Sequence, residues 1–128
     1  MKQVLLSERV IACAIDVRKE LGFGFLERVY ENALLVELAR ARIKVEQQRA
    51  LKVTYRGAVV GDYFADLIVE DKLLVEIKSI DRTVPAHSAQ LLNYLRATGL
   101  HVGLLLNFGP ARLGITRVVH DHDETAPI

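Results

Sequence analysis

The chain has 128 residues, of which 51% are hydrophobic and 26% charged, a composition that indicates one globular domain with a real core and excludes a mostly disordered chain. Its formal net charge of +1 excludes a global basic field, so an anionic partner must meet a local positive patch. The single cysteine, Cys13 in the apolar stretch VIACAI, excludes a disulfide framework, a Cys-rich zinc site and a cysteine-ligated iron–sulfur cluster within the chain, and is expected to be buried.

The N-terminal stretch MKQVLLSERV is too short and too polar for a signal peptide. No apolar run approaches the roughly 18 to 20 residues that are needed to cross a bilayer. We therefore expect a cytoplasmic protein with no membrane partner.

Two helices are predicted first. Apolar residues recur with helical spacing over 8–21, with Ser7 as the expected N-cap, and Gly22 and Gly24 permit the turn that ends this helix. A second helix is predicted from about 26 to 42, because its leucines and valines again follow a helical stripe.

The following residues change to the pattern of strands. IKVEQQ, LKVTY and AVV surround a turn at Arg56-Gly57, and DYFADLIV and KLLVEIK form the next pair of strands. A third helix is predicted over 83–98, with Pro85 at a position in the first turn where proline is tolerated. HVGLLLNF reads as a buried strand and GITRVV as an edge strand.

The predicted element order is therefore α-α-β-β-β-β-α-β-β, an α/β fold in which a mixed sheet is flanked by helices. Residues 1–119 are expected to form one domain and 120–128 a flexible tail, since HDHDETAPI has no apolar period. The histidines and aspartates of that tail have the chemistry to chelate a transition metal, but an exposed tail is the preferred interpretation.

Polar residues interrupt the hairpin DLIVEDKLLVEIKS, residues 66–79. Strand residues two apart share a face, so Glu76 and Lys78 point the same way. A two-residue turn would place Asp66 opposite Ile77, on the wrong face, whereas a three-residue loop or a bulge near 70–72 places Asp66 opposite Glu76. The charge pattern therefore predicts an unusual turn.

Two adjacent carboxylates repel, and burying them is costly unless their charge is neutralised. Lys78 can neutralise one of them, and a divalent cation between Asp66 and Glu76 resolves the remaining charge, with magnesium or manganese suited to hard oxygen ligands such as the carbonyl of Ile77. A lysine beside such a metal suits phosphodiester hydrolysis. The alternative is a solvated strand face with a surface Glu–Lys pair, which remains open on these residues alone.

These residues resemble a known pattern. Asp66, Glu76, Ile77 and Lys78 are similar to the D…(D/E)-x-K signature of the PD-(D/E)xK nuclease superfamily, with Ala65 where many relatives have proline. GFLERVY, from Gly24, matches the G-x-x-E-x-x-Y motif that names one of its small families, and QLLNY, from Gln90, matches the Q-x-x-x-Y motif of its exonuclease-like branch. The resemblance covers about residues 7–119 and implies a restriction-endonuclease-like core.

The resemblance also implies roles for individual residues. It assigns Asp66 and Glu76 as metal ligands and catalytic residues, Lys78 as the catalytic lysine, and Glu27 as an acid of the helix that binds the metal directly or through water. The alternative for Glu27 is an acid favoured by the positive end of the helix macrodipole.

For the third helix, the resemblance makes Gln90 and Tyr94 the pair that contacts substrate phosphate or positions the lysine. His87 shares their stripe and is a candidate hydrogen-bond donor to the scissile phosphate. A solvated helix face is the alternative for Gln90 and Tyr94, and an exposed histidine at the helix start is the alternative for His87.

The function expected from the sequence is a Mg²⁺- or Mn²⁺-dependent nuclease acting on DNA. The rival is a non-catalytic nucleic-acid-binding or subunit module that retains the fold. With 6% aromatic residues and no tryptophan, contacts are expected mainly with the nucleic-acid backbone. A homodimer formed at the GITRVV edge is a further expectation. The candidate residues for a phosphate path are Lys44, Arg49, Lys52, Arg56, Arg82 and Arg96.

Overall fold

A computed structural model describes residues 4–122 and 127–128 of the chain. The described helices are α1 (Leu6–Leu21), α2 (Glu27–Arg40) and α3 (Pro85–Thr98), and the strands are β1 (Val45–Tyr55), β2 (Ala58–Val69), β3 (Leu73–Lys78), β4 (Val102–Asn107) and β5 (Gly114–Val119). The strands form one sheet in the order β1-β2-β3-β4-β5. None of the described helices has the length and apolar character needed to span a bilayer.

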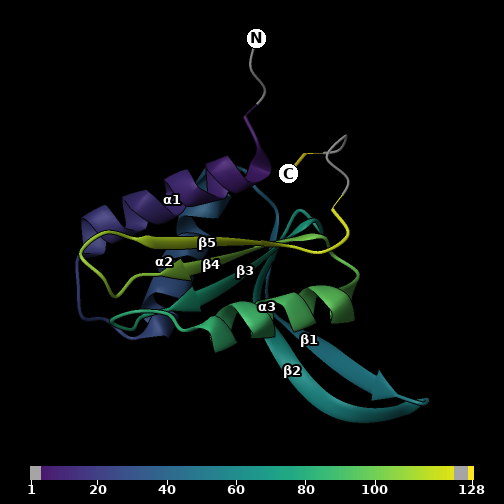
Figure 1. Ribbon diagram of the computed structural model, residues 1–128. Coiled ribbons are helices and arrows are strands. Elements are labelled where there is room, and N and C mark those ends of the chain that lie inside the picture. The colour runs from purple at the N-terminus through teal and green to yellow at the C-terminus, as the bar shows by residue number, and fades with distance from the viewer. Residues whose placement is uncertain (1–3, 123–126) are drawn as a thin grey trace.

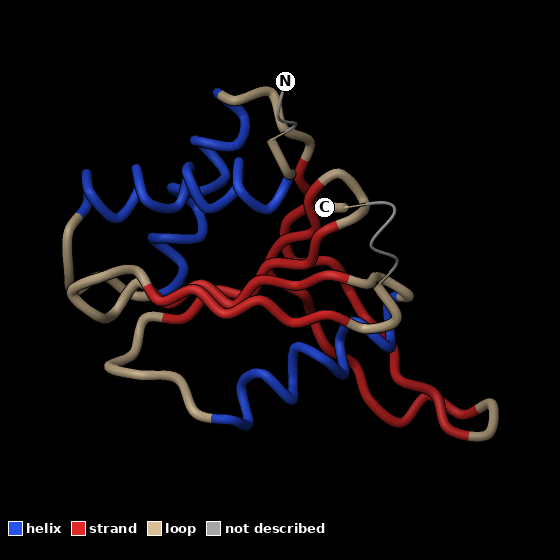
Figure 2. Tube along the Cα trace, turned by 45° about the horizontal axis from the view of Figure 1, so that its top comes forward, coloured by secondary structure: helices blue, strands red, loops and turns tan. Residues whose placement is uncertain are grey.

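The sheet is mixed, with helices on both faces, as the sequence predicts. Strands β3 and β4 are parallel and are connected through α3, while the other neighbouring strands are antiparallel. Helices α1 and α2 cover one face and α3 covers the other (Figures 1 and 2). A parallel connection needs such a crossover, because a tight turn can join only antiparallel strands.

Each face of the sheet has its own apolar cluster. Leu67, Val75 and Ile77 pack against α1 and α2, whereas Ile68 and Leu74 pack against α3. This separation follows from the alternation of side chains along a strand. The prediction that the odd-numbered residues of the 66–79 hairpin form a continuous core face is confirmed.

The element order differs from the prediction in one respect: three strands, not four, lie between α2 and α3. IKVEQQ and LKVTY belong to one strand, β1, which continues past an irregular residue, Gln48, with a φ of 54°. AVV and DYFADLIV likewise form the single strand β2. Both strands are interrupted by polar residues but not by a turn, which explains why the sequence pattern divides them.

Ser7 is not an N-cap, contrary to the prediction. Helix α1 begins at Leu6, and the Ser7 hydroxyl instead donates to the carbonyl oxygen of Ile128. Cys13 is buried in the core, as expected. The part of the predicted flexible tail over 123–126 lies outside the described residues.

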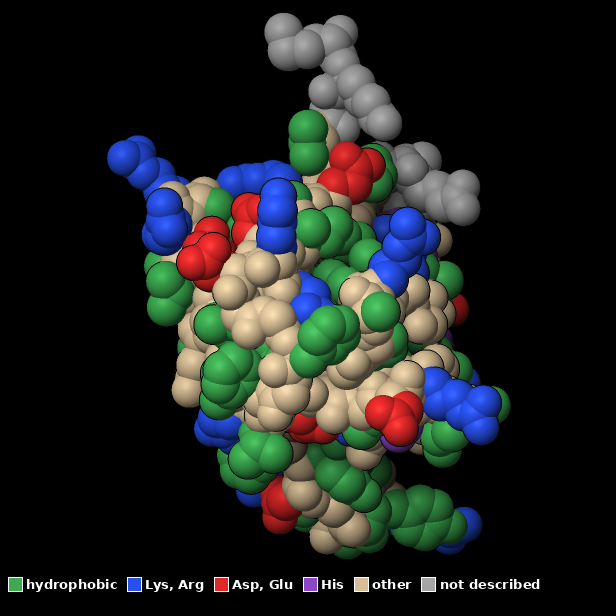
Figure 3. Space-filling view, turned by 90° about the vertical axis from the view of Figure 1, so that its left-hand side faces the viewer, with side chains coloured by type: hydrophobic (Ala, Val, Ile, Leu, Met, Phe, Trp, Pro, Cys, Tyr) green, Lys and Arg blue, Asp and Glu red, His purple; other side chains and the backbone are tan. Residues whose placement is uncertain are grey.

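The outer parts of β1 and β2, residues 50–64, form an arm that projects beyond the body of the molecule (Figure 1). Large apolar side chains on this arm are exposed, among them Tyr55, Val60 and Phe64. On the face shown in Figure 3, Lys and Arg side chains are interspersed with Asp and Glu, so this face carries no broad field of one sign.

Candidate active site

Asp66 and Glu76 lie opposite each other on β2 and β3. Leu67 pairs with Val75, and the same antiparallel register sets Asp66 across from Glu76. The loop between the strands has three residues, 70–72, as the charge pattern requires. The prediction of an unusual turn is confirmed.

The turn has a backbone conformation that is uncommon for side-chain-bearing residues. Glu70 and Asp71 have φ values of 53° and 55°, in the left-handed region. The carboxylate of Glu70 accepts from the N–H of Lys44 at 2.8 Å, which ties the turn to the start of the sheet. The register of the carboxylate pair is therefore fixed from outside the site.

Backbone N–H groups hold the two carboxylates together. The N–H of Ile77 donates to Oδ2 of Asp66 at 2.7 Å, and the N–H of Asp66 donates to Oε1 of Glu76 at 3.2 Å. Glu76 is only 8% exposed. Neither side chain is free to swing away, so the pair is preorganised without a bound ion.

Burial and, to a smaller extent, the negative charge of Asp66 together raise the pKa of Glu76 from 4.5 to about 9. The positive charge of Lys78 opposes this shift only in part. Without a metal, Glu76 therefore carries a proton at neutral pH, because two carboxylates in one site cannot both ionise cheaply. A divalent cation would displace that proton.

A buried acid that the sequence analysis did not select, Glu31 on α2, joins the pair through Gln48. The Nε2 of Gln48 donates to Oδ1 of Asp66 at 3.2 Å and to both oxygens of Glu31, at 3.2 and 3.0 Å. Gln47 donates to Glu31 at 2.6 Å, and Glu31 is 2% exposed. A signal was present, because Glu31 lies between the apolar stripe residues Tyr30 and Leu34.

Glu27 is not brought to the pair. It is exposed and is the first residue of α2. Across residues 4–122 and 127–128, no group of three or more His, Cys, Asp or Glu side chains is close enough to hold a metal ion. The position of Glu27 fits the interpretation as an acid at the positive end of a helix, and its metal role remains a prediction.

Tyr30, the tyrosine of the G-x-x-E-x-x-Y stretch, is a packing residue. It is fully buried and stacks on Phe108 with ring centroids 4.7 Å apart. Its hydroxyl donates to the carbonyl of Gly22 at 2.6 Å. It therefore fixes the turn between α1 and α2.

Lys78 is half-buried at the end of β3. Its carbonyl accepts from the N–H of Phe108 at 2.8 Å, and the side chain of Asn107 accepts from the N–H groups of Ile80 and Gly109, both at 3.1 Å. A side chain at Gly109 would collide with the carbonyl of Ile80. Hydrogen bonds therefore hold the backbone that follows Lys78 against the end of β4.

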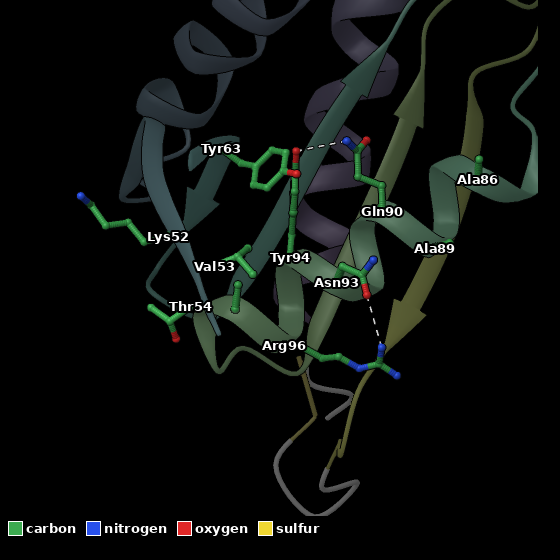
Figure 4. Close-up of a pocket in the computed structure, with 11 residues that line it drawn as sticks. Lys52, Val53, Thr54, Tyr63, Ala86, Ala89, Gln90, Asn93, Tyr94 and Arg96 are labelled. Atoms are coloured by element: carbon green, nitrogen blue, oxygen red, sulfur yellow. Dashed lines mark hydrogen bonds between the residues drawn. The ribbon is translucent and has the colours of Figure 1, made fainter. Parts of the chain in front are cut away.

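Tyr94 and Gln90 of α3 lie beside the pair. Gln90 Nε2 donates to the Tyr94 hydroxyl at 3.2 Å. Burial raises the pKa of Tyr94, and the negative charges of Glu76, Tyr63 and Asp66 add to that shift. The ring packs in one cluster with Ala65 and with Leu105, the strand partner of Glu76. Figure 4 shows Gln90 and Tyr94 side by side, with the ring of Tyr63 from β2 next to them.

His87 does not share this arrangement. Its ring Nδ1 accepts from the backbone N–H of Val84 at 3.1 Å, and the backbone N–H of His87 donates to the carbonyl of Val84 at 2.9 Å. The imidazole therefore caps the N-terminus of α3, and a contact with substrate remains a prediction.

A groove of about 800 Å³ separates α3 from the arm. Tyr63, Gln90 and Tyr94 line it, together with Lys52 and Arg96 of the predicted phosphate path (Figure 4). The other predicted basic residues are placed differently. Lys44 and Arg49 form ion pairs with Asp71 and Arg56 lies over the ring of Tyr55, while Arg82 precedes α3.

Comparisons with known proteins agree with this geometry. A family model described as the PD-(D/E)XK nuclease superfamily matches residues 5–118. No curated protein matches the chain.

Two solved structures are similar in fold. The crystal structure of SSO0001 has a TM-score of 0.59 and 22% identity and covers 77% of this chain, and the chain spans 52% of SSO0001. An alkaline exonuclease (LHK-Exo) from Laribacter hongkongensis has a TM-score of 0.53 and 15% identity over 94% of this chain and 73% of its own. The fold is thus restriction-endonuclease-like, with the order α-α-β-β-β-α-β-β.

Proposed function

Because the chain belongs to the PD-(D/E)XK nuclease superfamily, we propose that it is a divalent-metal-dependent nuclease that hydrolyses phosphodiester bonds, with DNA as its substrate. The observation that carries this proposal is the register that sets Asp66 opposite Glu76. Lys78 follows two residues later on the same face. We also propose that the chain belongs to the G-x-x-E-x-x-Y group, because residues Gly24 to Tyr30 match that motif.

The residues present fit a magnesium or manganese ion. Asp66 and Glu76 offer hard oxygen donors, and burial keeps Glu76 protonated until a cation takes the place of the proton. When bound, such an ion supplies Lewis-acid stabilisation of the phosphate and a more acidic water. The carbonyl of Ile77 is the proposed additional ligand.

Side chains of the protein would carry out the other parts of the proposed hydrolysis. Lys78, pointing to the same face as Glu76, holds the attacking water or stabilises the developing negative charge. Gln90 and Tyr94 contact the phosphate from α3. Glu31, through Gln48, fixes the orientation of Asp66, so we propose Glu31 as the acid of α2 that positions a metal ligand, while Glu27 keeps its proposed role of binding the metal directly or through water.

The enzyme proposal is tested by two substitutions. Asp66→Asn and Lys78→Ala should each abolish cleavage of labelled DNA in Mg²⁺ or Mn²⁺ while circular dichroism stays native. Matched controls are Asp16→Asn and Lys19→Ala on the exposed side of α1, which should retain full activity. If the wild type cleaves no single-stranded, duplex or branched substrate with either ion, the enzyme proposal fails.

Calorimetric titration of Mn²⁺ separates this function from the rival binding module. A nuclease should bind the ion with an affinity that Asp66→Asn removes. A protein that binds nucleic acid but no Mn²⁺ would support the non-catalytic module.

A further inference from the structure

The groove between the arm and α3 brings together groups that the proposed chemistry does not use. Tyr63 and Lys52 come from β2 and β1, and Arg96 comes from α3. Tyr63 pairs with Leu51 across the arm, and Leu51 belongs to the apolar cluster between the sheet and α3. The ring of Tyr63 therefore lies on the side of the arm that faces the helix.

Tyr63 is held in place but remains accessible. Its ring centroid lies 5.6 Å from that of Tyr94, with the planes tilted by 45°. A Cβ at Gly61 would lie 2.9 Å from Cε2 of Tyr63, so the ring rests against the glycine. The residue is still 44% exposed, which leaves aromatic surface open to a ligand.

One cationic side chain, Arg96 of α3, lies on the groove side, whereas the side chain of Lys52 extends away from the Tyr63 ring at the outer edge of the arm (Figure 4). Lys52 makes only a loose ion pair with Asp62, at 3.9 Å between two well-exposed side chains. Arg96 donates to the amide oxygen of Asn93 at 3.3 Å, and Asn93 also lines the groove. Arg96 thus has capacity for a further anion in the groove.

Tyr94 links the groove to the carboxylate pair. Tyr94, which lines it, packs in one cluster with Ala65, the neighbour of Asp66, and with Leu105, the residue that pairs with Glu76. Glu76 and Tyr94 are each only 8% exposed, and a strand bound in the groove would bring a phosphate next to Tyr94.

On these grounds we infer that the groove binds a single-stranded nucleic-acid segment, with a base stacked on Tyr63 and a phosphate near Arg96. This inference rests on the proposed function and names its substrate class. Sites for single strands combine aromatic stacking with a basic track. A duplex carries its phosphates on the outside of a stiff cylinder, and tight duplex binding needs more cations than Arg96 supplies among the residues that line this groove.

The volume agrees with this occupant. At about 800 Å³ the groove is within the range of roughly 300–1,000 Å³ typical of sites for small ligands. That space suits one or two nucleotides, not a turn of duplex.

The inference is tested by binding, separately from cleavage. Fluorescence anisotropy in EDTA compares a labelled pyrimidine oligonucleotide, as DNA and as RNA, with the same DNA sequence as a duplex. The single strand should bind more tightly in at least one of its two forms. Tyr63→Ala should weaken single-strand binding on the order of tenfold, because one stacked base is lost, while Tyr63→Phe should bind as the wild type does.

The matched control is Tyr55→Ala, which removes an exposed tyrosine from the same arm outside the groove and should leave binding unchanged. Tighter duplex binding, or equal single-strand binding by Tyr63→Ala and Tyr55→Ala, overturns the inference even if the protein cleaves DNA. If Tyr63-dependent single-strand binding occurs without cleavage, the inference stands and the nuclease proposal falls.

Discussion

The two halves of β2 differ in burial and in strand pairing. In the inner half, Leu67 and Val69 are completely buried between neighbouring strands. In the outer half, Val60 and Phe64 are 61% and 58% exposed, and this half of β2 pairs only with β1. Asp66 lies where one half becomes the other. The difference teaches that a rigid sheet fixes the carboxylates while the projecting arm forms one wall of the groove beside them.

The strongest test of this comparison is a pair of truncations in the same strand. Leu67→Ala should lower the free energy of unfolding by about 2–5 kcal/mol, because it leaves a cavity in the core. Phe64→Ala removes a larger but exposed side chain and should change it by no more than about 0.5 kcal/mol. Urea denaturation measures both, and similar losses would contradict the division of β2.

A second test concerns Glu76, which lies opposite Asp66 at the boundary between the two halves of β2. The pKa of Glu76 in the folded protein, about 9, lies above its ordinary value of 4.5. The folded state therefore retains a proton that the unfolded state has released, and the metal-free protein should lose stability as pH rises through this window. The slope is at most about 1.4 kcal/mol for each pH unit, and it should level off above about pH 9.

Glu76→Gln provides the control, because the amide cannot ionise. In EDTA, the variant should be more stable than the wild type by about 1–3 kcal/mol near pH 8 and by much less at pH 5. Urea denaturation at several pH values measures the difference. A difference that does not grow with pH would show that Glu76 ionises freely in the folded state.

The sequence predicted the inner half of β2 better than the outer half. The charges of Asp66, Glu76 and Lys78 at the ends of two apolar runs were enough to give the register of Asp66 and Glu76, because a slip of one residue would bury charges on the core face. The division of the two long strands was wrong, since Gln48 continues β1 despite its left-handed φ of 54°.

Other parts of the site depend on contacts that no local pattern contains. Glu31 reaches Asp66 only because Gln48 is displaced from the ladder and turns its amide between them. Tyr63 becomes a groove residue because the arm passes beside α3. Both arrangements join residues on different elements, and helical or strand periodicity carries no information about such pairs.

The third test compares two acids of α2, Glu31 and Glu27, for their effect on the site at Asp66. Glu31→Gln should weaken Mn²⁺ binding and cleavage on the order of tenfold, because groups that orient a metal ligand commonly contribute 10- to 100-fold. The exposed Glu27, replaced by Gln, should change either quantity by less than about twofold if its role is confined to the helix terminus.

Calorimetry and single-turnover cleavage report the two effects separately, and circular dichroism shows whether the buried Glu31→Gln retains its fold. The isosteric amide keeps one oxygen for the Gln47 and Gln48 donors, so the variant loses charge without leaving a cavity. If Glu27→Gln were the more damaging change, the acid named by the sequence motif would be the functional one. The link through Gln48 would then serve only to close the sheet against α2.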